Sequence, residues 1–165
     1  DIPGGNVHAY QLYTNAADKV SAQSLSAGLT YMARKGYTVG ANITWASFNL
    51  LDANPNNIPA FNTPEYSANM TLGNSNVYRN FGFQLNWHWQ DAFDWYGSFN
   101  GMRPGRINAY SLVDLQFNKK LPAINAQIKV GASNIFNNQV FQSYGSPAIG
   151  AIYFVAVTFD GLLKK

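Results

Sequence analysis

Residues 80–90 read NFGFQLNWHWQ, and apolar and neutral polar side chains alternate along this stretch. The apolar members share one face of an extended chain: Phe81, Phe83, Leu85, Trp87 and Trp89. The residues between them share the other face: Asn80, Gly82, Gln84, Asn86 and His88. Because successive side chains of a strand point to opposite faces, the alternation predicts a β-strand with one apolar face.

The same two-residue period recurs along most of the chain. Six further segments show it: 21–31, 37–45, 66–73, 113–118, 124–131 and 153–160. A shorter apolar stretch at residues 7–13 is a candidate for part of an eighth strand, and no segment has helical periodicity of useful length. The sequence therefore predicts an all-β protein built from seven or eight strands.

The connections between these segments alternate strictly between short and long. The short ones are 34–36, 74–76 and 119–123, and the long ones are 50–63, 91–107 and 137–150. Tight turns at one end of an antiparallel meander and long loops at the other are typical of transmembrane β-barrels.

The composition supports a membrane barrel. Hydrophobic residues make up 47% of the 165 residues, whereas charged residues make up only 12%. This balance excludes intrinsic disorder, and no apolar run approaches the length of about 18 residues that a membrane helix needs. The chain has no cysteine, which excludes disulfides and thiolate metal sites, and its scattered net charge of +3 does not make a nucleic-acid surface. We therefore expect an antiparallel transmembrane β-barrel.

Aromatic residues gather near the ends of the apolar faces, as expected for two membrane–water interfaces. With a periplasmic C-terminus, one girdle is expected near the outer interface: Trp45, Tyr66, Trp87, Trp89 and Tyr153. A second girdle is expected near the inner interface: Tyr31, Tyr37, Phe81, Phe117 and Phe159.

The polar faces and the long loops supply the candidate contact residues. The residues expected to face the lumen and a plug are Asn42, Asn69, Gln84, Asn86, His88, Gln116, Asn125 and Gln127. The outer-loop residues that are candidates for ligand contact are Trp95, Tyr96, Phe99, Arg103, Arg106 and Tyr144. Packing within the loops, or simple solvation, would explain the same loop residues.

No catalytic site, metal site or cofactor is predicted. His8 and His88 are the only histidines, and a metal site needs several convergent ligands. Asp91 and Asp94 resemble an acid–base pair, but they lie at the outer end of a strand, where solvation is the simpler expectation. The sequence has no nucleophile elbow and no phosphate-binding glycine loop.

Five motifs, in order, resemble the late barrel strands of TonB-dependent outer-membrane receptors. They are FNTPEY at 61–66, WQDAFDW at 89–95, INAYSLVD at 107–114, KVGASNIFN at 129–137 and YGSPAIGAIYFVAVTFD at 144–160. Each motif alone is weak, but the order and spacing of all five match the family over residues 61–160. The five C-terminal residues GLLKK depart from the usual aromatic terminus, which puts the match of the assembly signal in doubt.

The resemblance implies the last seven or eight strands of a 22-stranded barrel in the bacterial outer membrane. Residues 1–165 would be its C-terminal part, with long loops outside the cell and the C-terminus in the periplasm. Because seven strands cannot close a barrel, the plug domain and earlier strands are expected on a separate chain. The implied activity is energised uptake of a scarce ligand. The implied partners are that remaining part, TonB bound through it, outer-membrane lipid and lipopolysaccharide, and, in some relatives, a surface lipoprotein.

Two alternatives stay open. One is an autonomous eight-stranded outer-membrane barrel that uses residues 7–13 as its first strand. The other is a soluble, sugar-binding β-sandwich whose loop aromatics stack on sugar rings. The sequence does not distinguish a siderophore, cobalamin, an oligosaccharide or a peptide as the transported ligand.

Overall fold

The computed structural model describes residues 19–50, 61–96 and 104–159. These residues contain no α-helix, and none of their elements is a helix long and apolar enough to cross a membrane. The strands are β1 (Val20–Met32), β2 (Tyr37–Leu50), β3 (Tyr66–Tyr78), β4 (Phe81–Gln90), β5 (Phe93–Tyr96), β6 (Pro104–Ile107), β7 (Tyr110–Leu121), β8 (Ala126–Ser133) and β9 (Ile152–Phe159). The all-β prediction is confirmed, whereas the candidate strand at residues 7–13 lies outside the described residues.

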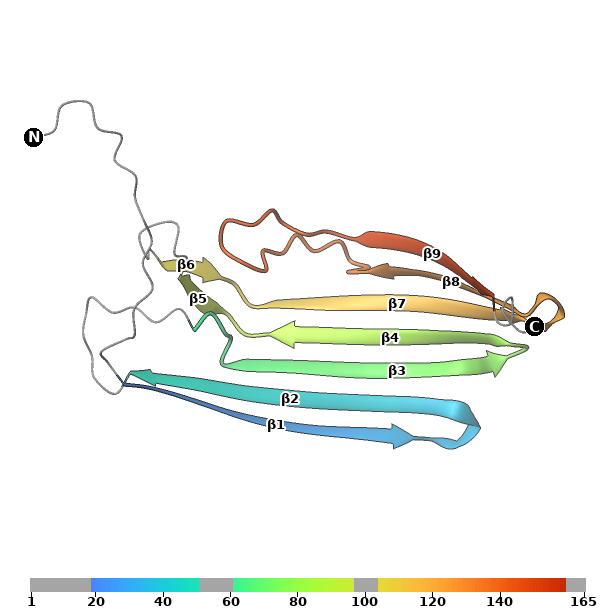
Figure 1. Cartoon of the computed structure of the whole chain (residues 1–165), viewed down its shortest axis with the longest axis horizontal. Helices are drawn as coiled ribbons and strands as arrows, with labels where there is room; N and C mark the ends of the chain where they lie inside the picture. Colours follow the sequence, from blue (N-terminus) through green and yellow to red (C-terminus); the bar gives the residue numbers. More distant parts are fainter. Residues whose placement is uncertain (1–18, 51–60, 97–103, 160–165) are drawn as a thin grey trace, which may run out of the picture.

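Seven strands form one antiparallel sheet in the order β1-β2-β3-β4-β7-β8-β9 (Figure 1). Each strand of this sheet pairs with the next, and the hairpin β5–β6 forms a separate two-stranded sheet within the connection from β4 to β7. Among the described strands β1 and β9 are the two edges, so the sheet is open. The three short turns lie together at one end, and the hairpin and the described β8–β9 connection lie toward the other (Figure 1).

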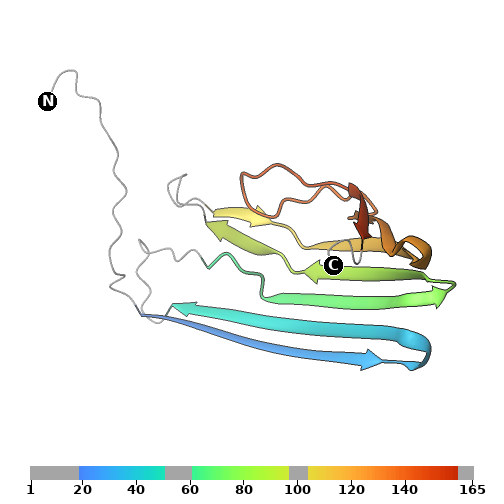
Figure 2. The same cartoon turned by 45° about the vertical axis from the view of Figure 1, so that its right-hand side comes forward.

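The register aligns the apolar positions of neighbouring strands. One row across the sheet runs Tyr31, Val39, Leu72, Leu85, Leu115, Ala132, Tyr153. Large side chains on this face are strongly exposed: Leu29 is 75% and Val155 is 73% accessible. The main sheet is a single curved layer (Figure 2), so its apolar face does not enclose a core in the described part of the chain.

The turn between β3 and β4 differs from the sequence-based expectation. A turn at residues 74–76 was predicted, but β3 continues to Tyr78, and the turn residues are Arg79 and Asn80, both with positive φ. The pairing register shifts between Asn74 and Tyr78. A Cβ on Gly82 would collide with the backbone of Asn74 and Ser75, so glycine at this position permits the irregular register.

The connection between β7 and β8 also differs. A strand was expected from residue 124, but residues Pro122–Ile124 form a 3₁₀ turn and β8 starts at Ala126. Asn125, predicted to face the lumen from a strand, instead caps this turn in the left-handed conformation, with its N–H bonded to Pro122 O. Proline has no N–H for a sheet ladder and asparagine tolerates positive φ, which explains why β8 starts only at Ala126.

Candidate functional site: the polar face and the hairpin platform

A hydrogen-bonded amide row crosses the polar face of β2, β3 and β4. Asn42 pairs with Asn69, and Asn69 pairs with His88. Asn69 Nδ2 donates to Asn42 Oδ1 at 2.8 Å, and His88 Nδ1 lies 2.7 Å from Asn69 Oδ1. Because this amide oxygen can only accept, His88 Nδ1 is the donor of this bond.

A second polar row lies closer to the short turns. Gln84 pairs with Gln116, and Gln84 Nε2 donates to Asn86 Oδ1 at 3.1 Å. Gln127 pairs with Lys120 further toward the turn. Apart from Lys120, these side chains are neutral amides with both donors and acceptors, so they can form hydrogen bonds with a polar partner of either kind.

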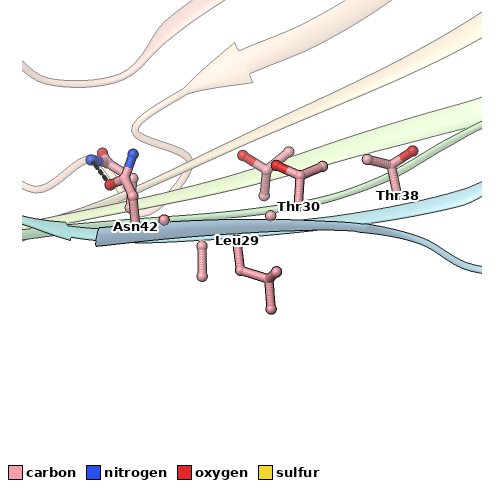
Figure 3. A pocket seen from close by; sticks show the side chains of 9 residues that line it. Leu29, Thr30, Thr38 and Asn42 are labelled. Atoms are coloured by element: carbon pink, nitrogen blue, oxygen red, sulfur yellow. Dashed lines mark hydrogen bonds between the residues drawn. The ribbon is translucent and has the colours of Figure 1, made fainter. Parts of the chain in front are cut away.

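A shallow hollow of about 350 Å³ opens on this face over β1, β2 and β3. Thr30, Thr38 and Asn42 rise into it, whereas Leu29 points to the opposite side of the sheet (Figure 3). Gly28 and Gly40 form part of its floor. Hydroxyl, amide and glycine groups line the hollow without a charged side chain, and the described residues contain no cluster of three or more metal-ligating His, Asp or Glu.

Seven of the eight predicted lumen residues lie on strands at polar-face positions, and Asn125 lies in the turn described above. That this face lines a lumen stays a prediction. Asp114 was not singled out from the sequence, although it lies on the same face of β7 and its carboxylate accepts a bond from the Asn134 N–H at 2.9 Å.

The hairpin β5–β6 is held by the segment before β3. Asn62 Nδ2 donates to Tyr96 O at 3.1 Å, and Asn62 Oδ1 accepts from the Tyr96 N–H at 2.8 Å. Phe61 stacks on Phe48 of β2 with ring centroids 4.9 Å apart. Ile107 at the end of the hairpin is 2% exposed, the most buried large side chain of the described residues. These contacts anchor the hairpin to the end of the main sheet.

The connection between β8 and β9 reaches the other side of the hairpin. The Tyr144 ring lies so close to Gly105 that a Cβ at that position would collide with it. The base of this connection is closed by Asn134, which exchanges two hydrogen bonds with Asn138, and by Asn137, whose Oδ1 accepts from the Ala151 N–H. We call β5, β6 and residues 134–151 the hairpin platform.

The predicted loop residues divide into two groups. Four of them belong to the platform, namely Trp95, Tyr96, Arg106 and Tyr144, whereas Phe99 and Arg103 lie outside the described residues. Arg106 pairs with Asp94 across the hairpin at 2.9 Å, and both side chains are more than half exposed. Arg106 also borders a cavity of about 120 Å³ together with Tyr110, Gln139 and Phe141. Ligand contact at any of these residues stays a prediction.

Sequence reasoning missed the residues that build the platform, above all Asn62, Asn134 and Gly105. A usable signal was present, because asparagine favours positive φ, and Asn62, Asn134 and Asn137 all adopt it.

The predicted girdle residues all lie on described strands, and several have local partners. Phe81 stacks on Phe117 at 5.6 Å near the short turns. Trp87 Nε1 donates to Ser111 Oγ, and Trp45 Nε1 donates to Glu65 Oε1. Tyr153, expected in the outer girdle, shares one row across the sheet with Tyr31, expected in the inner girdle. The two would lie at different depths only if the strands are tilted, so the division into two girdles stays a prediction. The complete set is Tyr31, Tyr37, Trp45, Tyr66, Phe81, Trp87, Trp89, Phe117, Tyr153 and Phe159.

Comparison with known proteins adds evidence on the fold. No protein-family model and no curated protein sequence matches the chain. A chain in the solved structure of the FpvAI–pyocin S2 complex aligns with a TM-score of 0.64 and 16% identity. The alignment covers 85% of this chain and 19% of that chain. At this identity the similarity establishes a shared fold over about a fifth of the length of that chain.

Proposed function

We propose that this chain forms part of the barrel wall of a TonB-dependent transporter in the bacterial outer membrane. The transporter would take up a scarce ligand with energy supplied through TonB. In this proposal the chain contributes wall, lumen lining and extracellular loops, and it carries out no catalysis. The observation that carries the proposal is a seven-stranded antiparallel meander with an exposed apolar face, similar in fold to a chain of a receptor complex.

The chemistry of the two faces supports the membrane assignment. A soluble β-sandwich would cover the apolar face with a second sheet about 10 Å away. In the described residues this face remains exposed, including Tyr153 at 76%. Lipid would bury the same side chains. The polar face carries amides and hydroxyls, and it would contact water or a plug domain instead.

The open edges support a larger assembly. The outer backbone groups of β1 and β9 have no strand partner among the described strands, and each unpaired group in lipid costs several kcal/mol. We propose that further receptor strands pair with both edges and that a plug domain contacts the polar face. Mass spectrometry of the purified assembly, intact and then denatured, would reveal whether these strands belong to a second polypeptide.

Uptake measurements test the transport proposal. A strain that lacks the complete protein is compared with its parent when iron–siderophore, cobalamin, an oligosaccharide or a peptide is the limiting nutrient. We expect a defect on one of these nutrients, and the same defect when TonB is deleted instead. Uptake that does not depend on TonB would contradict the proposal and would favour an autonomous barrel.

A further inference from the structure

The short-turn end of the main sheet carries five exposed cations: Arg34, Lys35, Arg79, Lys119 and Lys120. The carboxylates of the described residues lie elsewhere. Glu65, Asp91 and Asp94 lie near the long connections, and Asp114 lies within β7. Within the described part of the chain the only ion pair is that of Asp94 with Arg106. One end of the sheet therefore carries an uncompensated positive charge among these residues.

Hydrogen bonds connect the turns that carry these cations. Asn74 Nδ2 donates to Lys35 O at 2.8 Å and joins the first turn to β3. Lys119 Nζ donates to Arg79 O at 2.6 Å and joins β7 to the turn between β3 and β4. The Lys120 N–H donates to Asn80 O in the same region. The cations are thus presented by a connected set of turns rather than by independent loops.

Two of the five cations lie on the apolar side of the sheet. Lys119 pairs with Phe81 and follows the alternation of Phe117, so its side chain starts on the apolar face, whereas Lys120 starts on the polar face. The Arg79 guanidinium lies 5.1 Å from the centre of the Tyr78 ring, and Tyr78 pairs with Phe81. Arg79 and Lys119 are therefore adjacent, beside the stacked rings of Phe81 and Phe117.

If the apolar face contacts lipid, the depth of Arg79 and Lys119 in the bilayer affects the stability of the folded protein. A cation on the lipid face destabilises a barrel strongly at the bilayer midplane and only weakly near the interface. Exposed aromatic rings also prefer the interface. Arg79 and Lys119 would then lie at the depth of the lipid phosphates, and Lys119 Nζ keeps further protons to donate after its bond to Arg79 O.

We propose that Arg79 and Lys119, bordered by Tyr78, Phe81 and Phe117, bind the phosphate of an anionic glycerophospholipid. This inference rests on the proposed membrane location and names the headgroup that the short-turn end recognises. Two adjacent cations favour a headgroup of net negative charge, because the phosphate of a zwitterionic lipid is already compensated by its own cation.

Native mass spectrometry of the complete protein that contains this chain tests the site. Phosphatidylglycerol and phosphatidylcholine with identical acyl chains are added in equal amounts to the detergent-purified protein. We expect retention of phosphatidylglycerol to exceed that of phosphatidylcholine by about tenfold, and the preference to fall as salt is raised.

Two double variants distinguish lipid binding at Arg79 and Lys119 from a general effect of the protein's positive charge. Arg79→Gln/Lys119→Gln should abolish the preference for phosphatidylglycerol. Lys120→Gln/Lys129→Gln removes the same charge from the polar face and should keep the preference. Arg79→Lys/Lys119→Arg should also keep it. Circular dichroism and heat-modifiable migration establish that each variant is folded.

Three results would overturn the inference. The first is that the unmodified protein shows no preference for phosphatidylglycerol. The second is that the two Gln variants lose this preference to the same extent. The third is that an excess of inorganic phosphate displaces phosphatidylglycerol. If the protein still fractionates with the outer membrane, these results leave the proposed function intact. Failure of the unmodified protein to enter any membrane would overturn both proposals.

Discussion

Asparagine side chains make many of the contacts that join neighbouring strands and connections. Asn69 bridges two strands on the polar face, Asn62 fixes the hairpin, and Asn134 closes the base of the β8–β9 connection. An asparagine amide both donates and accepts, and its residue tolerates positive φ better than other non-glycine residues. These properties let one residue type satisfy both polar strand faces and tight turns without adding charge.

The Asn69 amide is predicted to stabilise the polar row. Asn69→Ala removes its bonds to Asn42 and His88, and we expect the free energy of unfolding in urea to fall by about 1 kcal/mol. Thr71→Ala is the control, because Thr71 lies on the same face of β3 and has no side-chain hydrogen bond in the described structure. If the free energy of unfolding fell equally in the two variants, the hydrogen bonds of Asn69 would contribute no specific stability.

Gly82 and Gly40 provide a matched test of backbone proximity. A Cβ at Gly82 would collide with the Ser75 backbone, whereas at Gly40 its nearest neighbour would be Thr30 Oγ1 at 3.6 Å. We expect Gly82→Ala to lower the free energy of unfolding by about 1–3 kcal/mol, and Gly40→Ala to change it by less than about 0.5 kcal/mol. Urea titrations followed by tryptophan fluorescence measure both. An unaffected Gly82→Ala protein would show that the irregular register does not need glycine.

At the scale of elements, the hairpin platform is positioned from two sides. The segment before β3 holds β5 through Asn62, and the β8–β9 connection places Tyr144 against Gly105 of β6. Both contacts come from segments that are distant in sequence from the hairpin. A short two-stranded hairpin has little stability of its own, so its position depends on these anchors.

Loss of the Asn62 anchor should loosen the hairpin selectively. In Asn62→Ala the Tyr96 N–H loses its acceptor, and we expect hydrogen–deuterium exchange over β5 to rise by about tenfold while β4 is unchanged. Thr63→Ala is the control, because the Thr63 hydroxyl bonds only to Phe61 O in the described structure. Unchanged exchange over β5 in Asn62→Ala would show that other contacts hold the hairpin.

At the scale of the whole molecule, a single layer separates two chemically different surfaces. One surface carries large exposed apolar side chains, and the other carries amides, hydroxyls and a shallow uncharged hollow. Neighbouring residues on one strand therefore meet different environments. The described residues form no core on the apolar side of this sheet, so they leave its large apolar side chains exposed.

Met70 and Thr71 test these two environments with one substitution. Met70 lies on the apolar face and is half exposed, whereas Thr71 borders the hollow on the polar face. We expect Met70→Arg to destabilise the protein in bilayers by about 2–4 kcal/mol and Thr71→Arg by less than about 1 kcal/mol. The folded fraction recovered in outer membranes and urea titrations in vesicles measure the difference. Equal tolerance of both substitutions would contradict lipid contact at the apolar face.

The sequence by itself determined the seven strands of the main sheet, their faces and their antiparallel order, because the two-residue period and the alternating connection lengths are local properties. Only the tertiary structure located the turn at Arg79–Asn80, moved Asn125 out of β8 and built the hairpin platform. These features depend on a collision that Gly82 avoids, on a cap formed after Pro122, and on contacts between segments distant in sequence. Such interactions have no period along the chain, so a pattern search does not detect them.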